Sequence, residues 1–135
     1  HVRVLDGFPI SRHLAAFDFA VASAGYNTFH ENLAAGLPTL FLGNDHPEQD
    51  EQWLRADYAA LRGLAVAARA DDIHGIRRGV QSLLEDGTRA RLKAACAAAS
   101  LANGAAATAR FLEDLAMTRK ESRLSFRVVP NEGQV

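Results

Sequence analysis

A nearly continuous apolar run over residues 17–22 leads directly into a glycine and a helical pattern, and this junction constrains the fold most. The run has the composition of a strand that helices cover on both faces. An amphipathic helix is then predicted from Gly25 to Ala35, with Gly36 ending it as the first residue beyond the cap. A strand that feeds a helix in this way is a unit of a parallel sheet, so we expect an α/β protein.

The start of this helix has the properties of an anion site. Backbone N–H groups of a first turn have no partners within the helix, and Gly25 has no Cβ to hold a phosphate oxygen away. Asn27 and Thr28 add side-chain donors in the same turn. Glu31 shares their face and leans toward the N-terminus. Because a carboxylate suits a diol, the pattern predicts a nucleoside diphosphate, with its phosphates on the helix start and its ribose on Glu31.

Simpler interpretations exist for each of these residues. Gly25 is alternatively a packing glycine, and Asn27 and Thr28 are alternatively caps of the helix. Glu31 is alternatively an ordinary acid near a helix N-terminus. Tyr26 either lines the site or packs against the strand, and we expect core packing.

The rest of the chain alternates short strands and helices, which predicts right-handed crossovers and an open, Rossmann-like parallel sheet with helices on both faces. We expect strands at 2–5, 17–23, 39–42 and 64–67. We expect a short helix opened by Pro9 and Ser11, with Ile10, Leu14 and Phe17 as its inward face, and the helix at 25–35 described above. The next helix is expected to start at His46, or alternatively at Asp50, and to run to Arg62. Three more are expected: one from the cap Asp71 to the break at Asp86 and Gly87, one at 88–102 and one at 105–117. The stripe of the helix after Asp71 is Ile73, Ile76, Val80, Leu83 and Leu84. Residues 1–117 are predicted to form one domain, and 118–135 a polar C-terminal tail.

Composition excludes several classes of protein. The 135 residues are 48% hydrophobic, enough for one domain with its own core. The net charge of −1 gives no basic field for nucleic acid. A single cysteine, Cys96, excludes an internal disulfide and lies on an apolar helix face, so we expect a small buried hydrophobe in a reducing compartment.

No apolar run is long enough to span a membrane, and no signal peptide precedes the first predicted strand, which indicates a cytoplasmic protein. The chain begins at His1, within that strand, which we interpret as the start of a fragment. A basic cluster lies near the C-terminus: Arg119, Lys120, Arg123 and Arg127. We interpret it as a solvated tail, with peripheral membrane association as the alternative.

A metal or a redox cofactor is not expected. The acidic loop Asp45, His46, Glu48 and Asp50 lacks the ligand spacing of known cation sites. The chain has neither the glycine fingerprint of dinucleotide enzymes nor the nucleophile elbow of hydrolases.

Three motifs in order resemble one enzyme family. Gly25, Tyr26, Asn27, Thr28 and Glu31 resemble the G-[WY]-N-[ST]-x-x-E motif of GT-B glycosyltransferases, in the half that binds the nucleotide-sugar. Gly36 with Pro38 follows, and then Glu51 and Gln52 lead into Arg55 and Ala56. The resemblance covers roughly residues 8–115. It includes the UDP-glycosyltransferases of small molecules and the N-acetylglucosaminyl transferase of peptidoglycan synthesis.

The resemblance implies roles for further residues. Glu51 and Gln52 match the pair that hydrogen-bonds the donor sugar, with an exposed helix face as the alternative. The loop 5–10 would hold the nucleotide base, with Phe8 and Ile10 in the base pocket, although core packing of Phe8 is favoured slightly. Ser23 stands where many plant relatives carry a histidine facing the diphosphate, so it would be a neutral hydroxyl contact. His13 and His30 are interpreted as ordinary histidines.

The implied activity is inverting, metal-independent transfer of a sugar from a nucleoside diphosphate sugar, UDP-sugar above all, to an acceptor hydroxyl. The general base and the acceptor site belong to the family's N-terminal half, so we expect no catalytic residue here and no transfer by this chain alone. Three alternatives stay open: a natural donor subunit that needs a partner, a nucleotide-sugar 2-epimerase of the same fold, and a degenerate half that serves as an interaction module.

Overall fold

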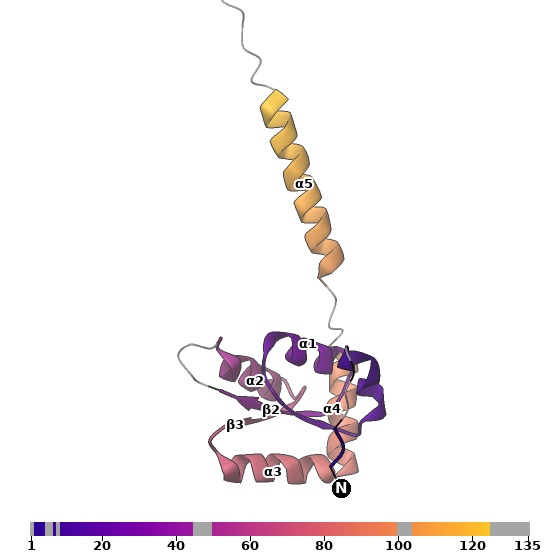
Figure 1. The fold of residues 1–135 in the computed structure, drawn as a ribbon, viewed down its shortest axis with the longest axis vertical. Coiled ribbons are helices and arrows are strands. Elements are labelled where there is room, and N and C mark those ends of the chain that lie inside the picture. The colour runs from indigo at the N-terminus through magenta and orange to yellow at the C-terminus, as the bar shows by residue number, and fades with distance from the viewer. Residues whose placement is uncertain (1, 5–6, 8, 45–49, 100–103, 125–135) are drawn as a thin grey trace, which may run out of the picture. The chain divides into compact units, whose positions relative to one another are not determined.

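Three parallel strands lie side by side between helices in the computed structural model, which describes residues 2–4, 7, 9–44, 50–99 and 104–124, the last six without side chains (Figure 1). The strands are β1 (Ala20–Ser23), β2 (Thr39–Gly43) and β3 (Val66–Arg69). The helices are the 3-10 helix η1 (Ile10–Ala16) and the α-helices α1 (Tyr26–Ala34), α2 (Gln52–Leu61), α3 (Ile73–Leu84), α4 (Asp86–Ala98) and α5 (Ala105–Leu124). The prediction of a Rossmann-like α/β fold is confirmed.

β2 is the central strand and sets the register of the sheet. Thr39 lies opposite Ala20 of β1, and Leu40 lies opposite Val66 of β3. Both pairings are parallel, so the carboxyl ends of all three strands meet at one edge of the sheet. The strands β1 and β2 therefore deliver the chain toward α1 and α2 from the same edge.

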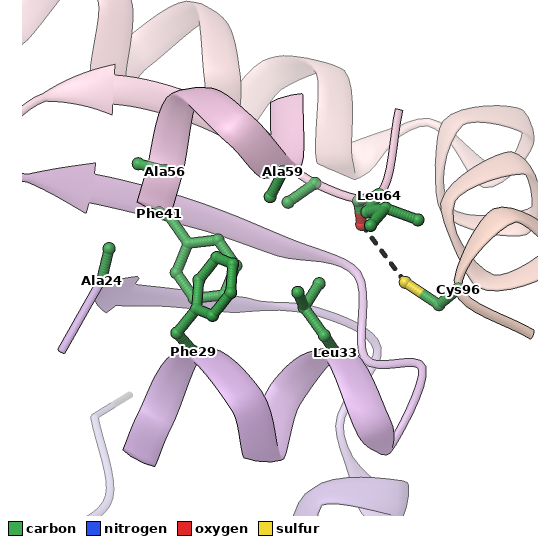
Figure 2. Packing of buried hydrophobic residues seen from close by; sticks show 9 residues of the cluster. Ala24, Phe29, Leu33, Phe41, Ala56, Ala59, Leu64 and Cys96 are labelled. Atoms are coloured by element: carbon green, nitrogen blue, oxygen red, sulfur yellow. Dashed lines mark hydrogen bonds between the residues drawn. The ribbon is translucent and has the colours of Figure 1, made fainter. Parts of the chain in front are cut away.

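Two hydrophobic clusters hold the helices on the sheet, and neighbouring residues of β2 supply their centres. Phe41 is fully buried on one face against α1 and α2, and Leu40 is fully buried on the other face against α3. Figure 2 shows Phe29 and Leu33 of α1 directed at Phe41. Both faces of β2 are covered, as expected for a strand in a parallel sheet.

Two glycines end α1 and α2 in the same way. Gly36 and Gly63 have positive φ values of 64° and 67°. After α1, the N–H of Gly36 donates to the carbonyl of Leu33, and the N–H of Leu37 donates to that of Asn32. This is a Schellman cap, in which the left-handed residue turns the chain toward the next strand. The predicted role of Gly36 is confirmed.

The strands differ from expectation in three places. Residues 2–4 of the expected first strand are not in a strand, and Val2 and Val4 are exposed, since alternation alone provides no neighbouring strand to pair with. β1 begins at Ala20, and Val21 is 46% exposed, so helices do not cover both of its faces. β3 begins two residues later than expected, because the Gly63 cap uses Leu64 to close α2.

Several helix ends also differ. α2 starts at Gln52, because Asp50 pairs with Arg55 and does not open the helix; the expected start at His46 lies outside the described residues. Asp72 caps α3 instead of Asp71, and its side chain accepts a hydrogen bond from the N–H of Gly75 at 2.9 Å. Ile73 and Leu84, at the two ends of the expected stripe, are exposed.

The break between α3 and α4 falls on Glu85, one residue earlier than expected, and α4 starts at Asp86. In η1, only Leu14 of the expected inward face is buried, while Ile10 and Phe17 are exposed. α5 extends beyond the expected end at Met117, as far as Leu124. The chain divides into two compact units, residues 1–101 and 102–135, and α5 belongs to the second.

Cys96 of α4 is a buried free thiol, as expected. It is 5% exposed, and its Sγ donates to the carbonyl oxygen of Leu64 at 3.3 Å, the dashed line in Figure 2. Burial raises the pKa of the thiol above its ordinary value, because a thiolate there would lose its hydration. The protonated thiol is also the form that can donate to a carbonyl.

This raised pKa predicts a loss of stability in alkali. The thiol keeps its proton to a higher pH in the folded chain than in the unfolded chain. Its contribution to the free energy of unfolding is therefore complete below the ordinary thiol pKa and is lost as pH rises through the folded pKa. Between these two pKa values, the free energy of unfolding should fall by up to about 1.4 kcal/mol per pH unit. Urea unfolding of the wild type and of Cys96→Ala between pH 7 and 10 should show their difference in free energy shrinking as pH rises. A constant difference would contradict the assignment.

Two helical glycines offer a matched test of the packing between α3 and the sheet. A Cβ on Gly79 would lie 2.7 Å from Cδ1 of the fully buried Leu40, whereas a Cβ on Gly87 would meet no atom of the described residues within 4 Å. Alanine favours both helices by up to about 1 kcal/mol. Gly79→Ala should nevertheless destabilise the protein by about 1–3 kcal/mol through overpacking, and Gly87→Ala should stabilise it. Thermal unfolding of both variants measures this, and equal shifts would contradict it.

Candidate functional site

The first candidate element is the start of α1, which follows β1 after two residues. Gly25 is the N-cap residue, with φ −60° and ψ 148°, and its carbonyl accepts the first helical hydrogen bond, from the N–H of Phe29 at 2.9 Å. A glycine has no side chain with which to cap the helix. The first-turn N–H groups therefore depend on solvent or on a ligand for their partners.

Among the residues that the structure describes, none requires a glycine at position 25. Its φ is negative, and within the described part of the chain a Cβ there would meet only Ser23 Oγ, at 3.9 Å. Gly43 differs, because a Cβ on it would lie 2.8 Å from the Cα of Trp53. The packing interpretation therefore applies to Gly43 and not to Gly25. The described neighbours of Gly25 leave room for a Cβ at this position.

The neighbouring side chains are accessible. Ser23, Asn27 and Thr28 are exposed around the half-buried Gly25. Tyr26 is 65% exposed, and its ring lies edge-on to that of His30, with the centroids 4.5 Å apart. The expectation that Tyr26 packs in the core is wrong, because Phe29 and Leu33 supply the buried face of α1.

Glu31 lies in the second turn of α1 and is exposed. Among the described residues, no hydrogen bond or ion pair engages its carboxylate. The first turn of α1 contains no acidic residue, so Glu31 does not sit where acids usually stabilise a helix start. Its carboxylate is available to a diol.

The second candidate element is the start of α2. Gln52 is the first residue of this helix and is half-buried, and Glu51 is its exposed N-cap, whose side chain makes no capping hydrogen bond. The two residues predicted to bind a donor sugar therefore lie at the start of a helix, on the same edge of the sheet as Gly25.

Arg55 joins these two elements. Its Nε donates to the carbonyl oxygen of Ala24 at 2.8 Å, and its Nη2 donates to the Asp50 carboxylate at 2.5 Å. The side chain is 22% exposed. In the sequence, Arg55 is notable only as part of the motif that begins at Glu51 and Gln52. A contact between residues thirty-one positions apart has no local pattern that would reveal it.

Of the two residues predicted for the base pocket, the structure describes only Ile10. Phe8, of the predicted base pocket, lies outside the described residues, as do Asp45, His46 and Glu48 of the acidic loop. Ile10 is 41% exposed at the start of η1. Within the described part of the chain, no group of three or more His, Cys, Asp or Glu side chains could hold a metal ion.

A separate hollow of about 520 Å³ lies along β3, between that strand, Trp53 and α3. Arg69 stacks on the Trp53 ring there, with the guanidinium carbon 4.4 Å from the ring centroid. None of the residues predicted to bind a nucleotide-sugar lines this hollow.

Comparisons with known proteins add no assignment. No protein-family model matches the chain, and no curated protein matches it. No helix in the part of the chain that the structure describes is long and apolar enough to cross a membrane. The starts of α1 and α2 therefore carry the features that point to a function.

The open space at Gly25 predicts a variant that folds normally and loses anion binding. Gly25→Ala should change the free energy of unfolding by about 1 kcal/mol or less, and should weaken pyrophosphate binding because its methyl group fills the space beside the first-turn N–H groups. Gly36→Ala is the control, since its positive φ makes alanine cost more than about 1 kcal/mol without touching the site. Thermal unfolding and amide-shift titration with pyrophosphate measure both. Undiminished binding by Gly25→Ala would contradict the site.

Proposed function

We propose that this chain is the donor-binding half of an inverting, metal-independent GT-B glycosyltransferase. The donor is a nucleoside diphosphate sugar, with UDP-sugar as the first choice. The observation that supports this proposal most is the direct bond between Arg55 of α2 and Ala24 beside Gly25. That bond holds the residues matched to the diphosphate motif next to those matched to the donor-sugar motif.

The proposed binding mode follows the two helix starts. The diphosphate lies against the first-turn N–H groups of α1, with Ser23, Asn27 and Thr28 as hydroxyl and amide contacts. The ribose hydroxyls donate to Glu31. The sugar hydroxyls contact Glu51 and Gln52, which offer carboxylate and amide groups at the start of α2. Charge-assisted hydrogen bonds of about 1.5–3 kcal/mol each are enough for micromolar nucleotide binding.

The proposed reaction is a direct displacement. An acceptor hydroxyl attacks the anomeric carbon, and the bond to the nucleoside diphosphate breaks as the new glycosidic bond forms. Negative charge grows on the leaving diphosphate, where preorganised N–H groups stabilise it. The general base that takes the hydroxyl proton, and the acceptor site, are contributed by another domain or by a partner, and isolated residues 1–135 transfer no sugar.

Two substitutions test the assignment of Glu31 and Gln52. Glu31→Ala should weaken both UDP and UDP-sugar by about 2 kcal/mol, or about thirtyfold, because it removes the acceptor for the ribose. Gln52→Ala should weaken UDP-sugar more than UDP, because it contacts only the sugar. Isothermal titration calorimetry of the wild type and both variants, with UDP and several UDP-sugars, gives these affinities.

Glu113→Ala, on the separate helix α5, is the matched control and should leave every affinity unchanged. A wild-type chain that binds no nucleoside diphosphate or its sugar would refute the proposed function. Equal losses for UDP and UDP-sugar in Gln52→Ala would remove this residue from the sugar site. If the chain converts UDP-N-acetylglucosamine to its 2-epimer, the proposed activity is epimerisation and not transfer.

A further inference from the structure

Arg55 makes two directed hydrogen bonds that converge on the candidate site from α2. Its Nε reaches the carbonyl of Ala24, and its Nη2 reaches Asp50, which stands just ahead of α2. The Arg55 side chain is 22% exposed and the Asp50 side chain 53% exposed. The pair is thus partly shielded from water on the guanidinium side, where the bond to the backbone lies.

The bond to Ala24 fixes the direction of the next peptide N–H. Ala24 is fully buried, and its own N–H donates to the carbonyl of Leu42 at 3.3 Å. In a planar trans peptide, the carbonyl of one residue and the N–H of the next point in opposite directions. Because Arg55 holds the Ala24 carbonyl, it also holds the N–H of Gly25, which points away from the guanidinium.

Both ends of the turn into α1 are therefore restrained. The Gly25 carbonyl is held by the N–H of Phe29, and the peptide before Gly25 is held by Arg55. Gly25 is the residue between them, and a glycine restricts φ and ψ least of all. Without Arg55, the buried Ala24 carbonyl would lose the partner that the structure shows for it, and the turn would gain freedom.

We propose that Arg55 is a positioning residue that orders the anion-binding turn at Gly25 and fixes its separation from Gln52. The nature of the anion, a nucleoside diphosphate, rests on the proposed function, whereas the ordering of the turn does not. Arg55 acts through the Ala24 peptide and does not itself contact the ligand.

The geometry requires an arginine. A guanidinium is planar, and its Nε and Nη2 can donate to two acceptors at once along one edge. The Asp50 carboxylate orients the group, so that Nε faces Ala24. A lysine ammonium can reach one of these acceptors as a point charge, but it has no fixed fork with which to hold both.

The test combines a measurement without ligand and a measurement with UDP. Arg55→Gln, Arg55→Lys and Asp50→Asn are compared with the wild type and with Arg62→Gln. This control removes the C-cap arginine of α2, which lies over the Tyr58 ring. Amide hydrogen exchange of the ligand-free chain is followed at Gly25, Tyr26, Asn27 and Thr28, with α4 amides as the reference for global stability. UDP affinity is measured well below the unfolding temperature, at low and high salt.

Arg55→Gln should speed exchange at the Gly25 turn relative to α4, and should weaken UDP about tenfold, with the same factor at both salt concentrations. Arg55→Lys and Asp50→Asn should have smaller effects than Arg55→Gln on both amide exchange and UDP affinity, and the two measurements should rank the variants in the same order. Arg62→Gln should change neither. If Arg55→Gln does not fold, the Arg55→Lys and Asp50→Asn comparison decides.

Unchanged exchange at the turn in the Arg55 variants overturns the proposal. A loss of UDP affinity that disappears at high salt also overturns it, because that result assigns a direct charge contact to Arg55. If the wild type binds no nucleotide, the proposed function fails, and the exchange measurement still decides whether Arg55 orders the turn.

Discussion

Parallel pairing of β2 with both of its neighbours is the constraint on which the rest of the structure depends. Leu40 and Phe41 are fully buried on opposite faces, so a slip of one residue would exchange the two clusters. The same pairing directs the carboxyl ends of β1 and β2 to one edge. The first turns of α1 and α2 both follow this edge because the central strand fixes the sheet, and open α/β sheets bind ligands at such an edge.

The glycines of this unit serve different purposes, and the structure separates them. Gly36 and Gly63 adopt a positive φ to end helices, and Gly43 and Gly79 admit a neighbour that a Cβ would displace. Gly25 does neither. A glycine at a strand-to-helix turn, for which the described residues give no requirement, is consistent with close approach of another molecule to the backbone. The distinction comes from local geometry and could not come from the sequence, which shows the same residue at each position.

Sequence patterns predicted correctly the features that depend on interactions between residues close together in the chain. The cap at Gly36, the strand β2 and the buried Cys96 follow from short-range sequence features, and the structure confirms them. The strand expected at residues 2–5 depended on alternation alone, and residues 2–4 show that alternation does not provide a pairing partner. Asp71 and Asp72 are equivalent as caps in sequence, and only the backbone turn selects Asp72. Arg55 was the least predictable, because its acceptor is a backbone carbonyl far away in the chain.

The starts of the helices show why α1 and α2, and not α3, form the candidate site. Asp72 places its own carboxylate on the N–H of Gly75, so the positive end of the α3 dipole already has an anion. The N-cap of α1 has no side chain, that of α2 makes no side-chain cap, and neither first turn contains an acid. The guanidinium of Arg55 lies between these two uncapped starts and adds a positive charge that Asp50 balances from the more exposed side. An anion bound at this edge would take the place that a capping carboxylate takes in α3, with its partners already oriented.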